Sequence, residues 1–280
     1  MNPILYEHHF NTSQTPLSPF KLKFIKQSKT VACNWHKQIE IILVTEGTGT
    51  IRYGAKEEIP LCSGEIAIVN SEVIHQIYSD TGISYYYIII DEKFCSDNGI
   101  DVEKIRFIEK TNDKETVSLF LEMKTEIEKM EECATLPAIA KVRRCVLSLM
   151  IDLCDHHLSA VNSKKIQESS PETYTKKAMI YLNEHYTSPF CLETLSNHLG
   201  INKHYLSRIF KKYTGQTPLG YSNMLRCRYA EYSISKGISI TEAAFNSGFE
   251  SLSYFSRTYK KLRGMSPTEF KNNLYEEELS

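Results

Sequence analysis

The 280-residue sequence contains no hydrophobic run near the ~18 apolar residues of a membrane-spanning helix. Its first ten residues also lack a basic segment followed by an apolar one, so we expect neither a signal peptide nor a membrane span. The eight cysteines form no C-x-x-C pair and are spread along the chain, whereas a zinc site or a disulfide framework would cluster them. Most are therefore expected to be small core residues in a reducing cytoplasm.

The net charge of the whole chain is also small, at −1. The balance is uneven, because residues 171–280 hold 14 Lys and Arg against 10 Asp and Glu, whereas residues 1–170 hold 19 against 24. A basic half joined to an acidic half indicates that one half meets a polyanion, although chance alone also produces a difference this small. The length suits about two domains, each large enough to bury its own core.

The first domain has the pattern of β structure. Short apolar runs recur between residues 20 and 90, separated by glycines such as Gly47, Gly49 and Gly64, and this spacing favours a sandwich or barrel. The expected strands are Phe20–Ile25, Ile39–Thr45, Thr50–Tyr53, Ile66–Val69, Ile74–Tyr78 and Tyr85–Ile90.

Residues 114–158 have a helical pattern instead. One apolar stripe of helical period could pack on the β unit or against a second subunit; it contains Ile139, Val142, Val146, Leu149, Met150 and Leu153. Residues 159–172 are polar and rich in serine, which indicates a linker. We therefore expect a β domain with flanking helices over 1–158, a linker over 159–172 and an all-helical domain over 173–280.

An internal repeat is the strongest signal in the helical domain. Residues 205–221 read YLSRIFKKYTGQTPLGY and residues 254–270 read YFSRTYKKLRGMSPTEF, identical at seven of 17 positions without a gap. Each copy has the parts of a helix-turn-helix unit: a short apolar helix, a glycine turn at Gly200 or Gly248, and a second helix capped by Asn202 or Ser251. Ser239 and Glu242 form a capping box at the second start.

The second helix of each copy separates its faces. The core set is expected to be Leu206, Ile209, Phe210 and Tyr213 in one copy and Phe255, Thr258, Tyr259 and Leu262 in the other. One such polar face is usually only solvated, but two copies with arginine at the same place favour DNA binding. Arginine in the major groove can donate two hydrogen bonds to guanine, and lysines contact phosphates. The helix between the copies, about 17 residues, would span about 25 Å, so the two units could enter successive major grooves of a non-palindromic site.

The motifs LETLSNHLGINKHYLSRIFKKYTGQTP and ISITEAAFNSGFESLSYFSRTYKKLRGMSP strongly resemble the DNA-binding domain of the AraC/XylS family of bacterial regulators. The resemblance covers residues 173–274 and implies seven helices, with recognition helices at about 203–213 and 252–262. By matching positions, it implies base-reading residues His204, Ser207, Arg208, Leu252, Ser253, Ser256 and Arg257. The rest of the expected DNA-binding set is Lys203, Lys211, Lys212, Lys260 and Lys261.

The segment from Asn34 to Ile77 looks like the cupin-like jelly-roll barrel that many family members place before the DNA-binding domain to bind a small effector. Trp35, His36, Glu40, Arg52 and His75 are its candidate effector-binding residues, although each could equally be ordinary barrel packing. Cupin enzymes hold a metal at positions that match Asn34, His36, Glu40 and His75. Asparagine is a poor ligand for such metals, so we expect no metal, no other cofactor and no catalytic residues.

The resemblance implies a bacterial, cytoplasmic transcription activator that responds to a small molecule such as a sugar, forms a homodimer through the helices near 139–158, and acts on RNA polymerase at a promoter. Two alternatives stay open. A regulator without a small-molecule effector would fill the barrel with side chains, and a cupin enzyme fused to a DNA-binding domain would need a metal. A DNA-repair alkyltransferase would need a clustered cysteine zinc site, which the sequence lacks.

Overall fold

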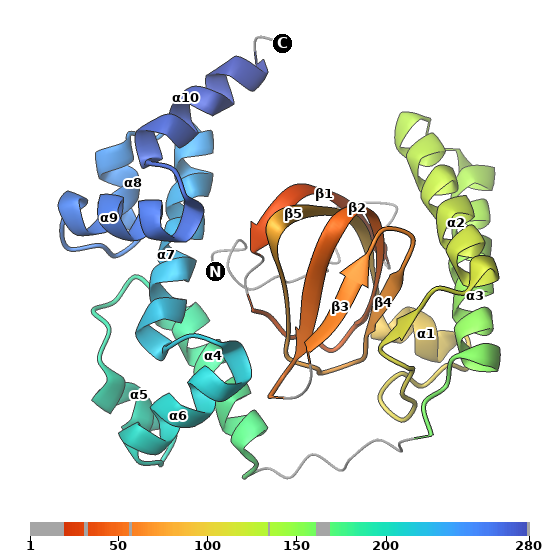
Figure 1. Ribbon diagram of the computed structural model, residues 1–280, viewed down its shortest axis with the longest axis horizontal. Helices are drawn as coiled ribbons and strands as arrows, with labels where there is room; N and C mark the ends of the chain where they lie inside the picture. The colour runs from red at the N-terminus through yellow and green to blue at the C-terminus, as the bar shows by residue number, and fades with distance from the viewer. Residues whose placement is uncertain (1–19, 31–32, 56–57, 134, 161–168, 279–280) are drawn as a thin grey trace. The chain divides into compact units, whose positions relative to one another are not determined.

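The computed structural model describes residues 20–30, 33–55, 58–133, 135–160 and 169–278, and the statements below concern these residues. They fall into two compact units, one within residues 9–165 and one within residues 166–280, which we describe separately (Figure 1). The expected linker, 159–172, lies largely outside the described residues. The domain boundaries therefore stay predictions.

The first unit is built on a curled antiparallel sheet of six strands, which confirms the expected β class (Figure 1). Two of the strands, Glu58–Cys62 and Lys110–Thr111, were not predicted. The order is β1-β5-β2-β4-β6, with β3 paired to β2. The strands are β1 (Phe20–Thr30), β2 (Ile39–Tyr53), β3 (Glu58–Cys62), β4 (Ile66–Val69), β5 (His75–Ile90) and β6 (Lys110–Thr111).

Two expected strand breaks are wrong. Ile39–Thr45 and Thr50–Tyr53 are parts of the single strand β2, and the last two predicted strands are parts of β5. The glycines produce register shifts within the pairing, between Val44 and Glu46 and between Gly47 and Thr50, because a bulge bends a strand without ending it. A Cβ at Gly47 would collide with the Gly82 carbonyl, and its φ of 77° also favours glycine.

Strand alternation divides the apolar residues of the sheet between its two faces. In β2, Ile39, Ile41 and Leu43 join the core formed with the helices, whereas Ile42 and Val44 join a second core on the other face. That second, inner core contains large side chains from several strands, Ile51, Tyr53, Leu61, Ile77, Ile83, Tyr85, Tyr87 and Ile89 among them. By the same alternation, Glu40 lies on the inner face.

Helices cover the outer face of the sheet. They are α1 (Glu92–Asp97), α2 (Lys114–Glu132) and α3 (Leu136–His156), capped by the side chains of Asp91, Asp113 and Thr135. The stripe on α3 packs inside this unit, since Val142, Val146, Leu149, Met150 and Leu153 share a core with Ile41 and Ile88 of the sheet. The structure thus selects the first of the two roles that the sequence left open for this stripe.

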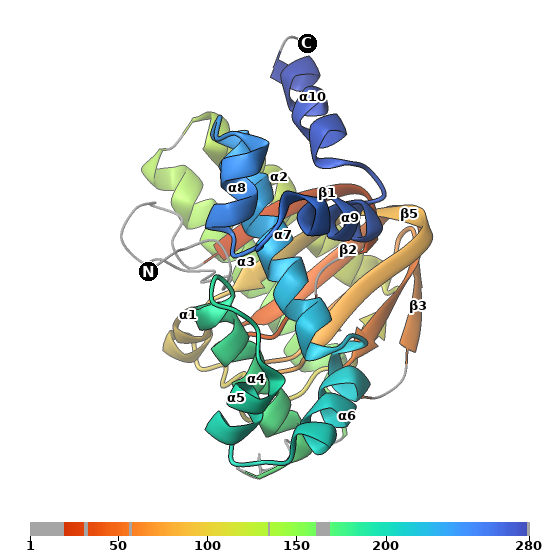
Figure 2. The same cartoon turned by 90° about the vertical axis from the view of Figure 1, so that its left-hand side faces the viewer.

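The second unit is all helical, with seven helices between residues 170 and 278. They are α4 (Pro171–His185), α5 (Leu192–His198), α6 (Lys203–Thr214), α7 (Pro218–Ser235), α8 (Ile240–Asn246), α9 (Leu252–Arg263) and α10 (Pro267–Glu278) (Figure 2). The expected caps are confirmed, because Asn202, Ser239 and Ser251 accept backbone N–H bonds at the starts of α6, α8 and α9. No helix among the described residues is long and apolar enough to cross a membrane.

Candidate nucleic-acid interface and ligand site

Helix α6 presents one buried face and one polar face. Leu206, Ile209 and Phe210 are buried in the helical unit, and Tyr213 is half-buried. The opposite side carries His204, Arg208, Lys211 and Lys212, all exposed, with Ser207 and Lys203 half-exposed. The helix ends at Gly215, whose φ of 76° closes the last turn in the left-handed conformation.

Helix α9 repeats this geometry. It buries Phe255 and Tyr259 and half-buries Thr258, and it ends at Gly264 with a φ of 77°. Exposed on its other side are Leu252, Ser253, Arg257, Lys260 and Lys261, with Ser256 half-exposed. Leu262 was expected in the core, but that prediction is wrong, since Leu262 is 36% exposed. Both expected recognition helices therefore display their polar residues to solvent.

Local contacts hold several of these polar side chains. The Lys203 ammonium lies 3.2 Å from the Glu193 carboxylate of α5, which ties the start of α6 to the preceding helix. The Arg208 guanidinium lies over the Tyr205 ring at 5.6 Å, and Arg257 Nε donates to the Ser253 carbonyl at 3.3 Å. These exposed contacts are weak, so both arginines can turn towards a ligand at little cost.

Helix α7 joins the two copies as the single helix predicted, and α9 is tied to it by a two-pronged ion pair. Arg263 donates to Glu231 through Nε at 2.6 Å and through Nη2 at 2.9 Å. Burial alone would lower the pKa of Arg263, but the paired carboxylate raises it, so the arginine keeps its charge. Two hydrogen bonds between one guanidinium and one carboxylate fix the orientation of α9 against α7 as well as their distance.

In the first unit, the structure brings together three of the five expected effector-binding residues. Glu40 Oε2 lies 3.0 Å from His36 Nε2 and 3.2 Å from His75 Nε2, and all three side chains are buried. Each His Nδ1 also lies 3.0 Å from a backbone carbonyl, that of Gln38 or Val73, which fixes the ring orientations. Burial alone would raise the pKa of Glu40, but the two histidine hydrogen bonds bring it well below its ordinary value.

The other two expected effector-binding residues are Arg52 and Trp35. Arg52 pairs with Gln76 across the strands and donates to its side chain at 2.6 Å. Its neighbours Ile51 and Tyr53 join the inner core, so alternation places Arg52 on the opposite face. Trp35 is half-buried beside His36. Sequence spacing could not separate these positions, because it does not show which face of a bulged strand a residue occupies.

Two groups among the described residues have the composition and spacing of metal ligands. The ligand atoms of His36, Glu40 and His75 lie within 4.8 Å of one another, as do those of Asp113, Asp152 and His157. In the second group the Thr116 hydroxyl lies between the ligands, 2.7 Å from Asp152 and 2.8 Å from His157, and satisfies them by hydrogen bonds. In the first group, the two histidine Nε2 atoms converge on Glu40 Oε2 instead.

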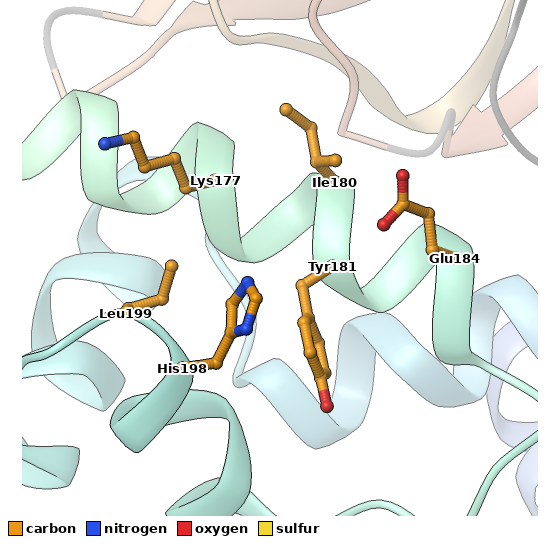
Figure 3. A pocket seen from close by; sticks show the side chains of 6 residues that line it. All are labelled: Lys177, Ile180, Tyr181, Glu184, His198 and Leu199. Atoms are coloured by element: carbon orange, nitrogen blue, oxygen red, sulfur yellow. The ribbon is translucent and has the colours of Figure 1, made fainter.

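The helical unit also has a hollow of about 230 Å³ that no sequence pattern indicated. Figure 3 shows it between α4 and the end of α5, lined by Lys177, Ile180, Tyr181, Glu184, His198 and Leu199. The centre of the Tyr181 ring lies 4.7 Å from that of His198 and 4.2 Å from that of His185, on which Tyr181 stacks. Most of these residues lie on α4, which is outside the repeat that singled out the other functional residues.

Comparison with known proteins gives the same division of the chain. Residues 26–138 match the model of an AraC-like ligand binding domain, and residues 195–273 match that of a helix-turn-helix domain. The uncharacterized HTH-type transcriptional regulator YisR of Bacillus subtilis is 32% identical over 104 residues, which are 37% of this chain and 36% of YisR. The HTH-type transcriptional activator RhaS of Escherichia fergusonii is 23% identical over 160 residues, which are 57% of this chain and 55% of RhaS.

Among solved structures, an apo ToxT variant of Vibrio cholerae has a TM-score of 0.53 at 14% identity, covering 91% of this chain and 98% of ToxT. This likeness concerns the fold. A β domain followed by a helical domain with two helix-turn-helix units is the architecture of a family of transcriptional regulators. The two units of this chain are similar, in the same order, to an AraC-like ligand binding domain and a helix-turn-helix domain. Its match spans little more than a third of the length of YisR.

Proposed function

We propose that this protein is a sequence-specific DNA-binding transcription regulator whose helices α6 and α9 read two neighbouring segments of the major groove. One observation carries the proposal: two copies of one helix, each ended by a left-handed glycine, present arginine and lysine on the face opposite the core. Arg208 and Arg257 occupy equivalent positions and would donate to guanine edges. Lys211, Lys212, Lys260 and Lys261 would contact phosphates.

The test is selection of bound sequences from a random duplex pool by the purified full-length protein. We expect a motif of two blocks about one helical turn apart, because α7 is 18 residues long and spans about 27 Å. If the full chain enriches nothing, selection with residues 170–280 separates two cases. Enrichment by the fragment would mean that the first unit silences DNA binding, and no enrichment by either would refute the proposal.

We further propose that the first unit senses a small polar molecule at the His36–Glu40–His75 cluster. Buried, oriented donors beside a carboxylate suit the hydroxyl groups of a carbohydrate, which is also the effector class that the family resemblance favours. A ToxT structure contains an unsaturated fatty acid, but at 13% identity that concerns ToxT alone. Thermal shift of the full chain against a panel of sugars tests this. A sugar that raises the melting temperature should lose its effect with Glu40→Gln.

A regulator without a small-molecule effector is the second candidate, and the inner core favours it. Large side chains, Tyr53, Tyr85 and Tyr87 among them, occupy the inner face of the sheet. Failure of every compound to shift the melting temperature, together with DNA binding by the purified protein, would support this candidate. In either case we propose an activator that acts as a homodimer on RNA polymerase in the cytoplasm, as the family resemblance implies. A reporter downstream of the selected site, in cells with and without the protein, gives the sign of regulation.

A further inference from the structure

The turns of the two helix-turn-helix units differ in what surrounds them. Gly200 and Gly248 each form the turn before the second helix of their helix-turn-helix unit, and both have left-handed backbones, with φ of +66° and +88°. A Cβ at Gly200 would meet nothing within 4 Å. A Cβ at Gly248 would lie 2.6 Å from the Thr187 carbonyl oxygen and 2.7 Å from its Cα. The turn of the second helix-turn-helix unit therefore packs directly against the backbone that connects α4 to α5, before the first helix-turn-helix unit.

Arg226 of α7 binds the same connection from the side. Its Nε donates to the Tyr186 carbonyl at 2.6 Å, and its Nη2 donates to the Ser188 carbonyl at 2.8 Å, so the two bonds flank Thr187. The guanidinium also lies 5.7 Å from the centre of the Phe249 ring, which is buried in the core of the second helix-turn-helix unit. Arg226 itself is only 5% exposed. The Arg226 side chain thus links the α4–α5 connection to the second helix-turn-helix unit.

A third contact reaches the recognition helix itself. Asn223, one turn before Arg226 on α7, donates through Nδ2 to the Tyr254 hydroxyl of α9 at 2.8 Å. Tyr254 in turn lies edge-on to Phe249, with ring centres 5.9 Å apart. The Arg226 Nε bond to Tyr186 is buried and the other two bonds are part-buried, and such bonds are costly to leave unmade, so each contact supports the others. Within the part of the chain that the structure describes, no atom comes within 4 Å of a Cβ placed at Gly200.

From these contacts we infer that Arg226 and Gly248 are positioning residues that lock the two helix-turn-helix units into one rigid body and so set the spacing of the DNA segments that α6 and α9 can read together. A single connecting helix would let the units twist and bend against each other. The contact between Gly248 and Thr187 removes that freedom because backbone meets backbone, where no side chain can yield. This inference rests on the proposed DNA recognition and adds to it a fixed distance between the two blocks.

The experiment measures the affinity of the full-length protein for its selected DNA and for the same DNA with one base pair added or removed between the blocks. One base pair turns a block by about a tenth of a helical turn and moves it by about 3.4 Å. We expect the wild type to lose about tenfold or more in affinity on either change. Gly248→Ala and Arg226→Lys should bind the original site more weakly and should reduce the spacing penalty to about threefold or less.

Gly200→Ala is the matched control, because it introduces the same backbone strain at the equivalent turn without a neighbour to displace. It should keep the full spacing penalty, which separates positioning from general loss of stability. Far-UV circular dichroism checks folding, and Arg226→Lys decides the matter if Gly248→Ala does not fold. A wild type that tolerates the altered spacing, or variants that keep its penalty, would overturn this inference while leaving DNA recognition intact. Failure of the wild type to bind any DNA would instead refute the proposed function.

Discussion

At the scale of single residues, we expect Arg208 and Arg257 to determine the sequence specificity of DNA binding. The lysines should contribute affinity for DNA of any sequence. Replacing either arginine by alanine should weaken binding to the selected site by about 1–3 kcal/mol, because a two-pronged bond to guanine is lost. Lys212→Ala is the comparison, and it should weaken binding to all sequences alike and reduce the dependence on salt. Fluorescence anisotropy on selected and random duplexes measures both effects. An equal loss on random DNA would show that the arginines contact phosphates instead.

Cysteine chemistry gives a second prediction for individual side chains. The neighbouring Thr194 hydroxyl and the Thr194 and Glu193 amides, which can donate to a thiolate, lower the pKa of Cys191, whereas the neighbouring Glu65 carboxylate raises the pKa of Cys62. Both thiols are exposed. Since the thiolate is the nucleophile, iodoacetamide near pH 7.5 should modify Cys191 severalfold faster than Cys62. Mass spectrometry of peptides measures the two rates, and equal rates would contradict the assignment.

The buried thiols are the internal control for that experiment. Burial raises the pKa of Cys33, Cys95 and Cys227 to about 12 in each case. They should stay unmodified until the protein is unfolded, and Cys191→Ser should remove the fastest reaction alone.

At the scale of elements, the Glu65 side chain joins two strands of the sheet, β3 and β6. Its carboxylate accepts from the Cys62 amide at 2.8 Å and pairs with Lys110 of β6 at 2.7 Å. Burial acts to raise the pKa of Glu65, but the bonds from Lys110 and Cys62 lower it below its ordinary value. The unfolded chain then binds more protons in acid, so this stabilisation is present at neutral pH and is lost as the pH falls through the carboxyl range near 4.

Glu65→Gln should therefore lower the free energy of unfolding at pH 7 by about 0.2–1 kcal/mol and should flatten its decline towards acid. Urea unfolding followed between pH 3 and pH 7 measures this. The exposed Glu46→Gln is the control and should leave the profile unchanged. The same decline in wild type and in Glu65→Gln would show that other carboxyls dominate.

At the scale of the whole molecule, the structure changes the reasoning about the proposed dimer. The α3 stripe that suggested dimerisation is used within the chain, so a second copy would have to meet the outer side of the helix pair. Ile151 of α3 is 54% exposed there. Ile151→Glu should shift a dimer towards monomer in sedimentation velocity, because a charge would replace an apolar contact. Phe245→Glu, at a residue 50% exposed in the helical unit, is the control. A wild type that stays monomeric at tens of micromolar would exclude the dimer.

The helix-turn-helix units were predictable from the sequence because their signals are local. A capping side chain, a helical period and a left-handed glycine act within a few residues, so α6, α9 and their caps follow from the repeat itself. The curled sheet was predictable as a class, but not its two long strands. Gly47 marks a bulge rather than an end only because β5 pairs with β2 on both sides of it, which is a contact between distant residues.

The residue types, their order and the repeat therefore determined what kind of protein this is and which helices carry its polar residues. Tertiary structure alone decided which of the candidate residues lie together in space. It gathered His36, Glu40 and His75 and turned Arg52 away, since the face of a residue depends on bulges and pairing along the whole strand. It also placed the α4–α5 connection against Gly248 but left Gly200 open. The repeat alone does not show that difference, because it depends on what the fold packs against each turn.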